Sequence, residues 1–293
     1  MPIEFVLCDV FAERPFAGNP LAVLFGADAI DDDERLALAR EFGWSEITFV
    51  APPERAGGAP RVDIWTPTGR LPFAGHPTIG TTVVCVRRGL LPASGPATLE
   101  LGIGPTPVEV IELDERGGIA RMTGRRPEFG VVVEDRPALA AALGLDRSDL
   151  LPELPVQTAS VGSAFLIVPL RSLDALRRLR PDPAALPDLL RAAGARRPYA
   201  FTLETLDPGA TVHAQMRDVD REDPATGSAA GALGAYLVEH RAVPPGRIEI
   251  EQGHAMERPS RLTVEVAGYP GDLQPVRIAG RVVVWAEGRL SGT

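Results

Sequence analysis

Two glycine-rich segments lie about 150 residues apart, and each stands where a helix is expected to begin. They read FAGHPTIG at residues 73–80 and EDPATGSAAG at residues 222–231. Both combine ionisable side chains with glycines, which leave the backbone open to a ligand. The first turn of a helix has N–H groups without helical partners and about half a positive charge. Two such helix starts facing each other predict a site for a small carboxylate that needs no basic side chain.

Strand and helix signals follow one another in a similar order in the two halves of the chain. In the first half, strands are predicted at 3–10, 21–25, 47–50, 61–65, 98–101 and 108–113, and helices at 33–42 and from Pro77 to 87–89. In the second half, strands are predicted at 119–123, 164–168, 199–203, 211–216, 247–251, 262–266 and 276–286, and helices at 137–143, 173–179, 183–193 and 226–240. The last helix is rich in glycine and alanine, which suits a buried helix wrapped closely by a sheet.

This repeated order predicts an α+β fold of two similar domains, each a curved and mostly antiparallel sheet around a central helix. We expect an N-terminal domain over residues 1–118, to which a final strand near 281–293 is a candidate to return, and a C-terminal domain over 119–280. The turn at 115–118 is the candidate boundary. The active site is expected where the two helix starts meet, in the cleft between the domains.

The composition excludes several classes of protein. All thirty basic residues are arginines, so the chain has no lysine amine for a Schiff base with pyridoxal phosphate or for a P-loop. The net charge of -9 and the lack of any basic cluster longer than an Arg-Arg pair predict no nucleic-acid partner and no role at a membrane surface. The acidic Glu4 near the first residue and the absence of an apolar run of about 20 residues predict a cytoplasmic protein.

Cysteine and histidine spacings give no metal-binding pattern. Cys8 and Cys85 belong to neither a CxxC pair nor a zinc spacing, and we interpret them as buried, reduced thiols. No two histidines are spaced as in HxxxH or HExxH; they are His76, His213, His240 and His254. A metal site would have to be assembled from distant parts of the chain, and we expect none.

Glu46 and His76 are the candidates for proton transfer in the first half. His76 follows Gly75 at the predicted helix start, where a lone histidine is either a structural contact or a catalytic group. Glu46 begins a predicted strand, where a glutamate is most often a solvated edge residue. If Ile47 faces a core, Glu46 lies on the opposite face. Trp44 nearby is expected to desolvate the carboxyl group and raise its pKa above about 4.3, as a proton carrier near neutral pH requires.

Asp223 is the candidate acid of the second half. An aspartate just before a proline and a helix start is often an ordinary helix cap. The neighbouring Thr226, Gly227 and Ser228 add hydroxyl groups and open backbone N–H groups of the kind that bind anions. Because no GxSxG sequence surrounds Ser228, we expect it to form hydrogen bonds and not to act as a nucleophile.

Over nearly its full length the chain resembles the PhzF-type phenazine-biosynthesis isomerase family. The matching segments are GNPLAV at 18–23, WSEITFV at 44–50, TPTGRLPFAGHPTIGT at 66–81, ATGSAAG at 225–231, and QG and RPS between 252 and 260. The resemblance implies a diaminopimelate epimerase-like fold, a homodimer and no cofactor. It implies catalysis by Glu46, His76, Asp223 and Ser228, with the glutamate moving a proton between two carbons of a cyclic amino acid. We expect the substrate to be bound at Asn19, Gly75, Thr226 and Gly227.

Two sets of positions differ from related proteins. The two-base epimerases of this fold carry a cysteine at each helix start, where this chain has Ala74 and Ala225. A single carboxyl group that removes and returns a proton on one face fits an isomerase better than a racemase. Four further positions depart from the family pattern and leave the substrate open; they are Arg70, Gln215, Arg217 and Glu257.

The expected function is that of a cofactor-independent isomerase. It would move a proton within a small carboxylate-bearing metabolite, a cyclic or unsaturated amino acid. The alternative is a protein of the same fold that binds a small carboxylate without turnover. A hydrolase or lyase that uses Asp223 and His76 is a third, weaker interpretation.

Overall fold

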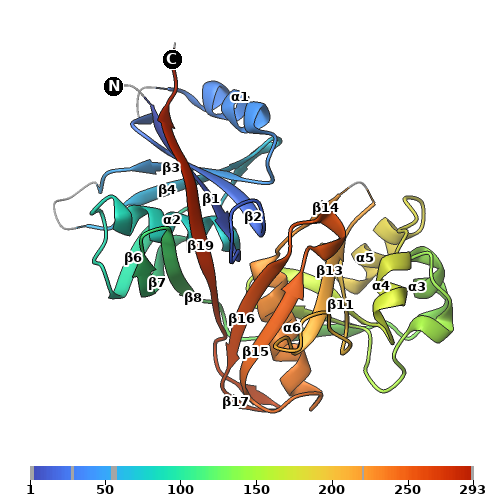
Figure 1. Ribbon diagram of the computed structural model, residues 1–293. Helices are drawn as coiled ribbons and strands as arrows, with labels where there is room; N and C mark the ends of the chain where they lie inside the picture. The colour runs from blue at the N-terminus through green and yellow to red at the C-terminus, as the bar shows by residue number, and fades with distance from the viewer. Residues whose placement is uncertain (1–2, 28–29, 54–57, 220, 292–293) are drawn as a thin grey trace. The chain divides into compact units, whose positions relative to one another are not determined.

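The computed structural model describes residues 3–27, 30–53, 58–219 and 221–291 (Figure 1). The chain consists of two compact units: unit 1 comprises Met1–Met122 and Ala279–Thr293, and unit 2 comprises Thr123–Ile278. The predicted domain limits at 118 and 280 stay predictions, and the turn at 115–118 lies in a hairpin of unit 1. Among the described residues, no helix is both long enough and apolar enough to span a membrane.

Unit 1 contains two helices and a set of mostly antiparallel strands among its described residues (Figure 1). In chain order they are β1 (Glu4–Val10), β2 (Asn19–Phe25), α1 (Asp32–Phe42), β3 (Ile47–Ala51), β4 (Arg61–Thr66), β5 (Gly69–Leu71), α2 (Gly75–Arg87), β6 (Gly95–Leu101), β7 (Gly104–Asp114), β8 (Gly117–Thr123) and β19 (Arg277–Arg289).

The strands of unit 1 form a sheet that closes on itself. β1 pairs antiparallel with β2 and β19, β2 pairs parallel with β3, and β3 pairs antiparallel with β4. β4 continues in parallel to β6, then antiparallel pairs lead through β7 to β8, which pairs with β19. The enclosed helix is α2, whose residues Gly75–Val86 are all buried. Gly80 lets it approach the sheet, because a Cβ there would lie 2.5 Å from Leu21 Cδ2.

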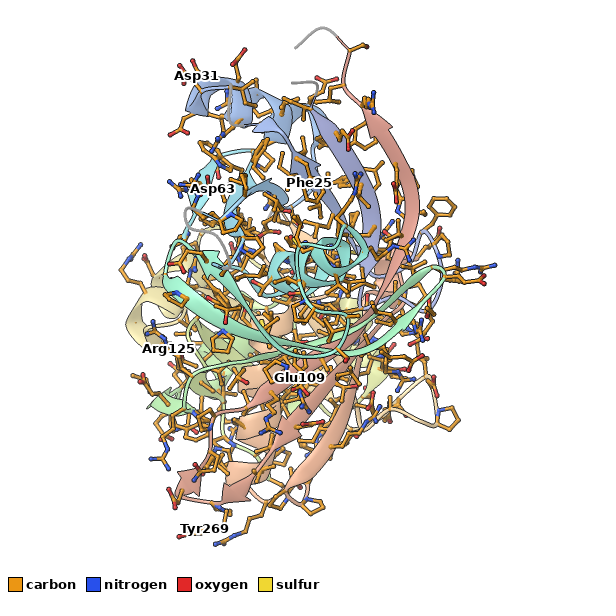
Figure 2. The ribbon with its side chains drawn as sticks, turned by 90° about the vertical axis from the view of Figure 1, so that its left-hand side faces the viewer. Phe25, Asp31, Asp63, Glu109, Arg125 and Tyr269 are labelled. Carbon is orange, nitrogen blue, oxygen red and sulfur yellow. The ribbon has the colours of Figure 1, made fainter. Side chains whose placement is uncertain are left out.

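Helix α1 lies between the parallel strands β2 and β3, and its ends follow the sequence signals. Asp31 and Glu34 form a capping box at its beginning, and Gly43 ends it with φ 63° (Figure 2 labels Asp31). Its Ala39 packs with Ile47 in a hydrophobic cluster outside the α2 core. The helix predicted at 33–42 is therefore confirmed.

Unit 2 contains the remaining elements. In chain order they are β9 (Glu128–Val132), α3 (Arg136–Ala142), η2 (Arg147–Asp149), β10 (Gln157–Ser160), β11 (Ala164–Pro169), α4 (Leu173–Arg178), α5 (Leu186–Ala193), β12 (Arg197–Thr202), β13 (Val212–Arg217), β14 (Glu222–Asp223), α6 (Gly227–Glu239), β15 (Gly246–Gln252), η3 (His254–Met256), β16 (Ser260–Val266), β17 (Gly268–Tyr269) and β18 (Asp272–Leu273).

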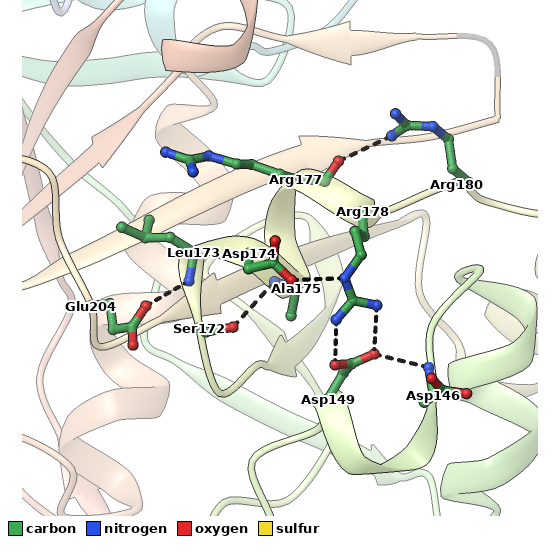
Figure 3. Close-up of polar contacts among 10 residues, drawn as sticks. All are labelled: Asp146, Asp149, Ser172, Leu173, Asp174, Ala175, Arg177, Arg178, Arg180 and Glu204. Carbon is green, nitrogen blue, oxygen red and sulfur yellow. Dashed lines mark hydrogen bonds and ion pairs between the residues drawn. The ribbon is translucent and has the colours of Figure 1, made fainter.

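Helices cover both faces of the unit 2 sheet, whose strands run β9-β10-β11-β12-β13-β15-β16. On one face, Tyr236 of α6 packs edge-to-face on Phe201 of β12. On the other, Leu166 of β11 packs in a cluster with residues of α3, α4 and α5. Arg178 of α4 holds this helical layer to η2 through a two-pronged ion pair with Asp149 (Figure 3).

The two units repeat one order of pairings. In each, an antiparallel pair leads through a helical crossover to a parallel strand, then to an antiparallel strand and a short hairpin strand. A buried helix follows, α2 or α6, and the chain returns to the sheet in parallel. The predicted α+β fold, with a central helix in each half, is confirmed.

Several predicted element bounds were wrong, or the elements were missed. Helix α2 begins at Gly75, two residues before Pro77; proline fits there because the first-turn N–H groups have no helical acceptor. Helix α5 begins at Leu186 and not at 183. Strands β5, β9 and β10 were not predicted, because they are short or polar and lack a clear alternation of apolar residues.

Candidate active site

Glu46 lies directly before β3, and strand alternation turns its side chain toward α2. The Thr48 hydroxyl hydrogen-bonds the Thr81 hydroxyl of α2 at 2.9 Å, so this face of β3 looks into the enclosed helix. Ile47 faces the cluster beneath α1. Glu46 shares the face of Thr48, because residues two apart point the same way. Its side chain is 19% exposed, which rules out the solvated edge position.

His76 meets Glu46 at the first turn of α2. Its Nδ1 lies 3.7 Å from Glu46 Oε2, and its side chain is 5% exposed. This distance suits an ion pair but is longer than a hydrogen bond. Contacts of this kind in active sites often shorten only when substrate binds. The first helical hydrogen bond of α2 runs from the Thr78 N–H to Ala74 O. The backbone N–H groups of Gly75 and His76 precede it and therefore lie in the open first turn. Unit 1 therefore combines a carboxylate, an imidazole and a helix start.

The segment that carries Glu46 is held by the start of β2. Ser45 Oγ donates to the Oδ1 atom of Asn19 at 3.2 Å, and Asn19 is fully buried. Gly18 is required at the preceding turn, because it has φ +61° and a Cβ there would lie 2.3 Å from Val10 O. Asn19 thus positions this segment, and its role in substrate binding stays a prediction.

Aromatic rings flank the same segment. Trp44 packs against Phe42 and Trp285, with ring centroids 5.5 and 6.5 Å apart. Phe16 packs on the other side of Trp285 at 5.4 Å. These rings provide apolar surface two residues from Glu46.

Asp223 and Thr226 form the corresponding group in unit 2. Asp223 lies on the short strand β14, and Thr226 Oγ1 donates to Asp223 Oδ2 at 2.6 Å. Thr226 directly precedes α6, and its carbonyl oxygen accepts the first helical hydrogen bond, from the Ala230 N–H. Gly227 and Ser228 therefore lie in the open first turn of α6. A carboxylate, a hydroxyl group and a helix start therefore lie together here as well.

Sequence reasoning missed the residues that hold this group. Gln252, at the end of β15, is fully buried; its Nε2 donates to Asp223 O at 2.7 Å and to Thr226 Oγ1 at 3.2 Å. Its Oε1 accepts from Tyr199 Oη at 2.7 Å and from the Thr226 N–H at 3.2 Å. Burial, and then the nearby charge of Asp223, raise the pKa of Tyr199, so its hydroxyl group remains a donor. The only sequence signal was the QG segment of the family resemblance.

Three of the four positions that depart from the family pattern have visible side-chain partners. Arg70 forms an ion pair with Asp63, labelled in Figure 2. Gln215 Nε2 donates to Glu222 Oε1 at 2.9 Å, next to Asp223 in the sequence. The Nη1 atom of Arg217 lies 3.8 Å from Glu222 Oε2. The contacts of Gln215 and Arg217 lie at β14, the strand that also carries Asp223.

The fourth of these positions, Glu257, adopts a left-handed backbone. It has φ +57°, a conformation that glycine adopts without strain. A glycine at this place would adopt the same backbone without strain.

No thiol stands at either helix start. Ala74 precedes α2 and the buried Ala225 precedes the N-cap of α6. Cys8 and Cys85 are free and buried, as predicted, in β1 and in the later part of α2. Burial raises the pKa of Cys85 to about 12, so it is not a thiolate base near neutral pH. The ionisable side chains at these helix starts are carboxyl groups and an imidazole.

One further group in unit 2 concerns the expectation that the chain has no metal site. His213, Glu251 and His254 bring possible ligand atoms within 4.8 Å of one another. These residues come from three separate elements, which the histidine spacing in the sequence does not reveal.

The chain matches a known family and solved structures. Residues 8–288 match the family described as phenazine biosynthesis-like protein. The trans-2,3-dihydro-3-hydroxyanthranilate isomerase of Pseudomonas aeruginosa is 36% identical, with 98% of each chain covered. A crystal structure of a PhzF-family phenazine biosynthesis protein from Bacillus anthracis has a TM-score of 0.87 and 27% identity, covering 99% of each chain.

A more distant structural neighbour extends the fold comparison. A hydroxyproline epimerase from Agrobacterium vitis has a TM-score of 0.64 at 14% identity, with 99% of this chain and 94% of the other covered. That likeness shows the epimerase-type fold alone. The full-length match and the named relatives give one conclusion: the chain belongs to the phenazine biosynthesis-like protein family, and it is an isomerase.

Proposed function

We propose that this isomerase moves a proton between two carbons of a small metabolite that bears a carboxylate, a cyclic or unsaturated amino acid, without a cofactor. The observation that carries the proposal is the pairing of Glu46 with His76 at the first turn of α2. A relative named for trans-2,3-dihydro-3-hydroxyanthranilate supports the substrate class. Homodimer formation is part of the same proposal.

Glu46 performs both halves of the reaction. Its carboxylate takes a proton from one substrate carbon, and the electron pair of the broken C–H bond moves into the adjacent unsaturated system. The resulting carboxylic acid then returns the proton to a second carbon on the same face. The protein ends as it began, so the step consumes no co-reactant. Positioned proton transfer of this kind contributes roughly 10² to 10⁴ in rate.

His76 and the helix starts stabilise charge in this mechanism. His76 lies beside Glu46 and donates a hydrogen bond where negative charge develops on the substrate. The first-turn N–H groups, including those of Gly75 and Gly227, bind the substrate carboxylate. Each helix end contributes about 0.3–1 kcal/mol, or up to about 2 kcal/mol when partly buried.

Asp223 and Ser228 complete the proposed site. The hydrogen bonds from Thr226 and Gln252 fix Asp223 at the start of α6. We propose that this group also takes part in the reaction. Asp223 then relays protons, and the Ser228 hydroxyl group hydrogen-bonds the substrate.

The test is turnover by the purified chain without added cofactor. Substrates are trans-2,3-dihydro-3-hydroxyanthranilate and a panel of cyclic unsaturated amino acids, and NMR detects a shifted double bond. We expect conversion of at least one compound, with His76→Asn and Asp223→Asn slower by about 10²-fold or more. Asp188→Asn, an exposed aspartate on α5, is the matched control and should keep full activity.

Two results would contradict the proposal. Thermal stabilisation by members of the panel with no conversion of any would identify a non-catalytic carboxylate-binding protein. Release of a leaving group or addition of water would identify a lyase or a hydrolase.

A further inference from the structure

Three side chains from separate elements of unit 2 meet near the end of β15. His213 lies on β13 and faces Glu251 on the parallel neighbour β15, and His254 begins η3 just after β15 ends. Gly253 makes the turn between them with φ +81°. One possible ligand atom of each residue lies within 4.8 Å of the other two.

Glu251 is a buried carboxylate with a fixed orientation. It is 1% exposed; Oε1 accepts from the Leu206 N–H at 2.5 Å and from His213 Nδ1 at 2.8 Å, and Oε2 accepts from the Asp207 N–H at 3.0 Å. Burial alone would raise the pKa of Glu251, but these hydrogen bonds outweigh it and the pKa is lowered. These three hydrogen bonds hold the carboxyl group in one orientation.

The hydrogen bond to Glu251 also fixes the tautomer of His213. Because an ionised carboxylate only accepts, Nδ1 of His213 carries the proton of this hydrogen bond. A metal ion bound by both side chains would take the place of that proton, with one ring nitrogen and one carboxylate oxygen as ligands.

His254 brings the second imidazole. Its ring centroid lies 5.1 Å from that of His213, with 42° between the planes. Its Nδ1 is buried, and within the described part of the chain it has no hydrogen-bond partner. The nearby positive charge of Arg261 is paired with Asp207.

We propose that His213, Glu251 and His254 bind a transition-metal ion of the Zn²⁺ type, in a site separate from the proton-transfer residues. Two imidazoles and a carboxylate are a common ligand set for Zn²⁺. Zn–N bonds of about 2.0–2.1 Å place two ligands of a tetrahedral ion about 3.3 Å apart, so the side chains need to close by a small rotation. Water takes the open position.

Bound metal would fix the end of β15, which carries Gln252. Glu251 and His254 flank Gln252 in the sequence, and Gln252 holds Asp223 and Thr226 by hydrogen bonds. The turn is close-packed, since a Cβ at Gly253 would lie 2.5 Å from Pro224 O. Metal binding should therefore stabilise the start of α6.

The experiment titrates Zn²⁺ into the purified, chelator-treated full chain by calorimetry and Co²⁺ by visible absorption. We expect one ion per chain, a Co²⁺ spectrum of a tetrahedral or five-coordinate nitrogen–oxygen site, and a higher unfolding temperature with Zn²⁺. His254→Ala should abolish saturable binding, and Glu251→Gln, which removes a charged ligand, should weaken it by at least the roughly 10- to 100-fold that loss of an outer partner costs. His240→Gln is the matched control, because His240 bonds to Gln157 and lies outside the cluster.

The outcomes separate a metal site from a fold effect. His254 is partly exposed, so His254→Ala should melt at the parental temperature when no metal is present. Absence of saturable Zn²⁺ binding by the parent chain, unchanged affinity in a folded His254→Ala, or equal loss in His240→Gln would each overturn the proposal. If His254→Ala does not fold, an octahedral water-like Co²⁺ spectrum in the parent chain would overturn it.

Discussion

Single residues decide which carboxyl groups face the helix starts. Glu46 could not be separated from a solvated edge residue by sequence pattern, because β3 is buried on both faces and shows no polar alternation. The hydrogen bond between Thr48 and Thr81 identifies the inner face of β3, and Glu46 shares it. His76 and Asp223 were recognisable because each stands next to a glycine-rich helix start.

The residues that position Asp223 could not be predicted from sequence. Gln252 lies 29 residues from Asp223, and Tyr199 lies 53 residues from Gln252. Neither has a local signal, since a glutamine ending a strand and a tyrosine within one are ordinary. Their roles follow only from the pairing of the strands that carry them.

The first prediction concerns the hydroxyl group of Tyr199. Tyr199→Phe removes the hydrogen bond to Gln252 Oε1, which should lower the free energy of unfolding by about 0.5–1.5 kcal/mol. The turnover rate should also fall, because Gln252 then holds Asp223 less rigidly. Tyr236→Phe is the control: it removes a similar bond to Pro155 O and should leave the turnover rate unchanged. Equal effects on turnover in the two variants would refute a positioning role for Tyr199.

At the scale of elements, the two central helices were the most predictable part of the fold. Their small residues and lack of charge before the last turn identify helices that a sheet surrounds. Strands β9 and β10 were missed because their pairing depends on neighbours far along the chain and not on their own residues. The left-handed backbone at Glu257 had no sequence signal beyond its departure from the family pattern.

The second prediction concerns Glu257, the residue that follows the short helix η3. A left-handed backbone at a residue other than glycine lowers the stability of the folded chain by roughly 1–2 kcal/mol. A glycine lowers that stability by about 0.4–1 kcal/mol, because it increases the conformational entropy of the unfolded chain. Glu257→Gly should therefore raise the free energy of unfolding by about 0.5–1 kcal/mol. Glu153→Gly, at a loop position without positive φ, is the control and should lower it. A loss of stability in Glu257→Gly would show that its side chain makes a compensating contact.

At the scale of the whole chain, the repeated order of pairings accounts for two similar units. The sequence indicated this duplication through the succession of strands and glycine-rich helix starts. It could not establish how the first sheet closes, because β19 pairs with β1 across more than 270 residues. Long-range pairing of this kind is fixed by packing around α2 and not by local preference.

The third prediction concerns stability below neutral pH. Burial lowers the pKa of His240 and of His254, so the unfolded chain takes up protons first as the pH falls below about 6.5. Stability should therefore fall through that range and level off below the native pKa values. Stability should fall a second time below about pH 4, because the unfolded chain then takes up protons at carboxyl groups whose pKa is lowered in the folded chain, such as Asp149.

The midpoint of thermal unfolding, measured in chelator from pH 8 to 4, checks this expectation. His240→Gln should show a smaller loss between pH 7 and 5 than the parent chain. An identical pH profile in the two proteins would remove His240 as a cause.

The most direct test of the central claim is the uptake of solvent deuterium at a substrate carbon in heavy water. The parent chain should exchange the transferred position with solvent, and Glu46→Gln should lower the exchange rate by about 10² to 10⁴. Glu41→Gln, an exposed glutamate on α1, should exchange at the parental rate. Undiminished exchange in Glu46→Gln would contradict the assignment of Glu46 as the group that carries the proton.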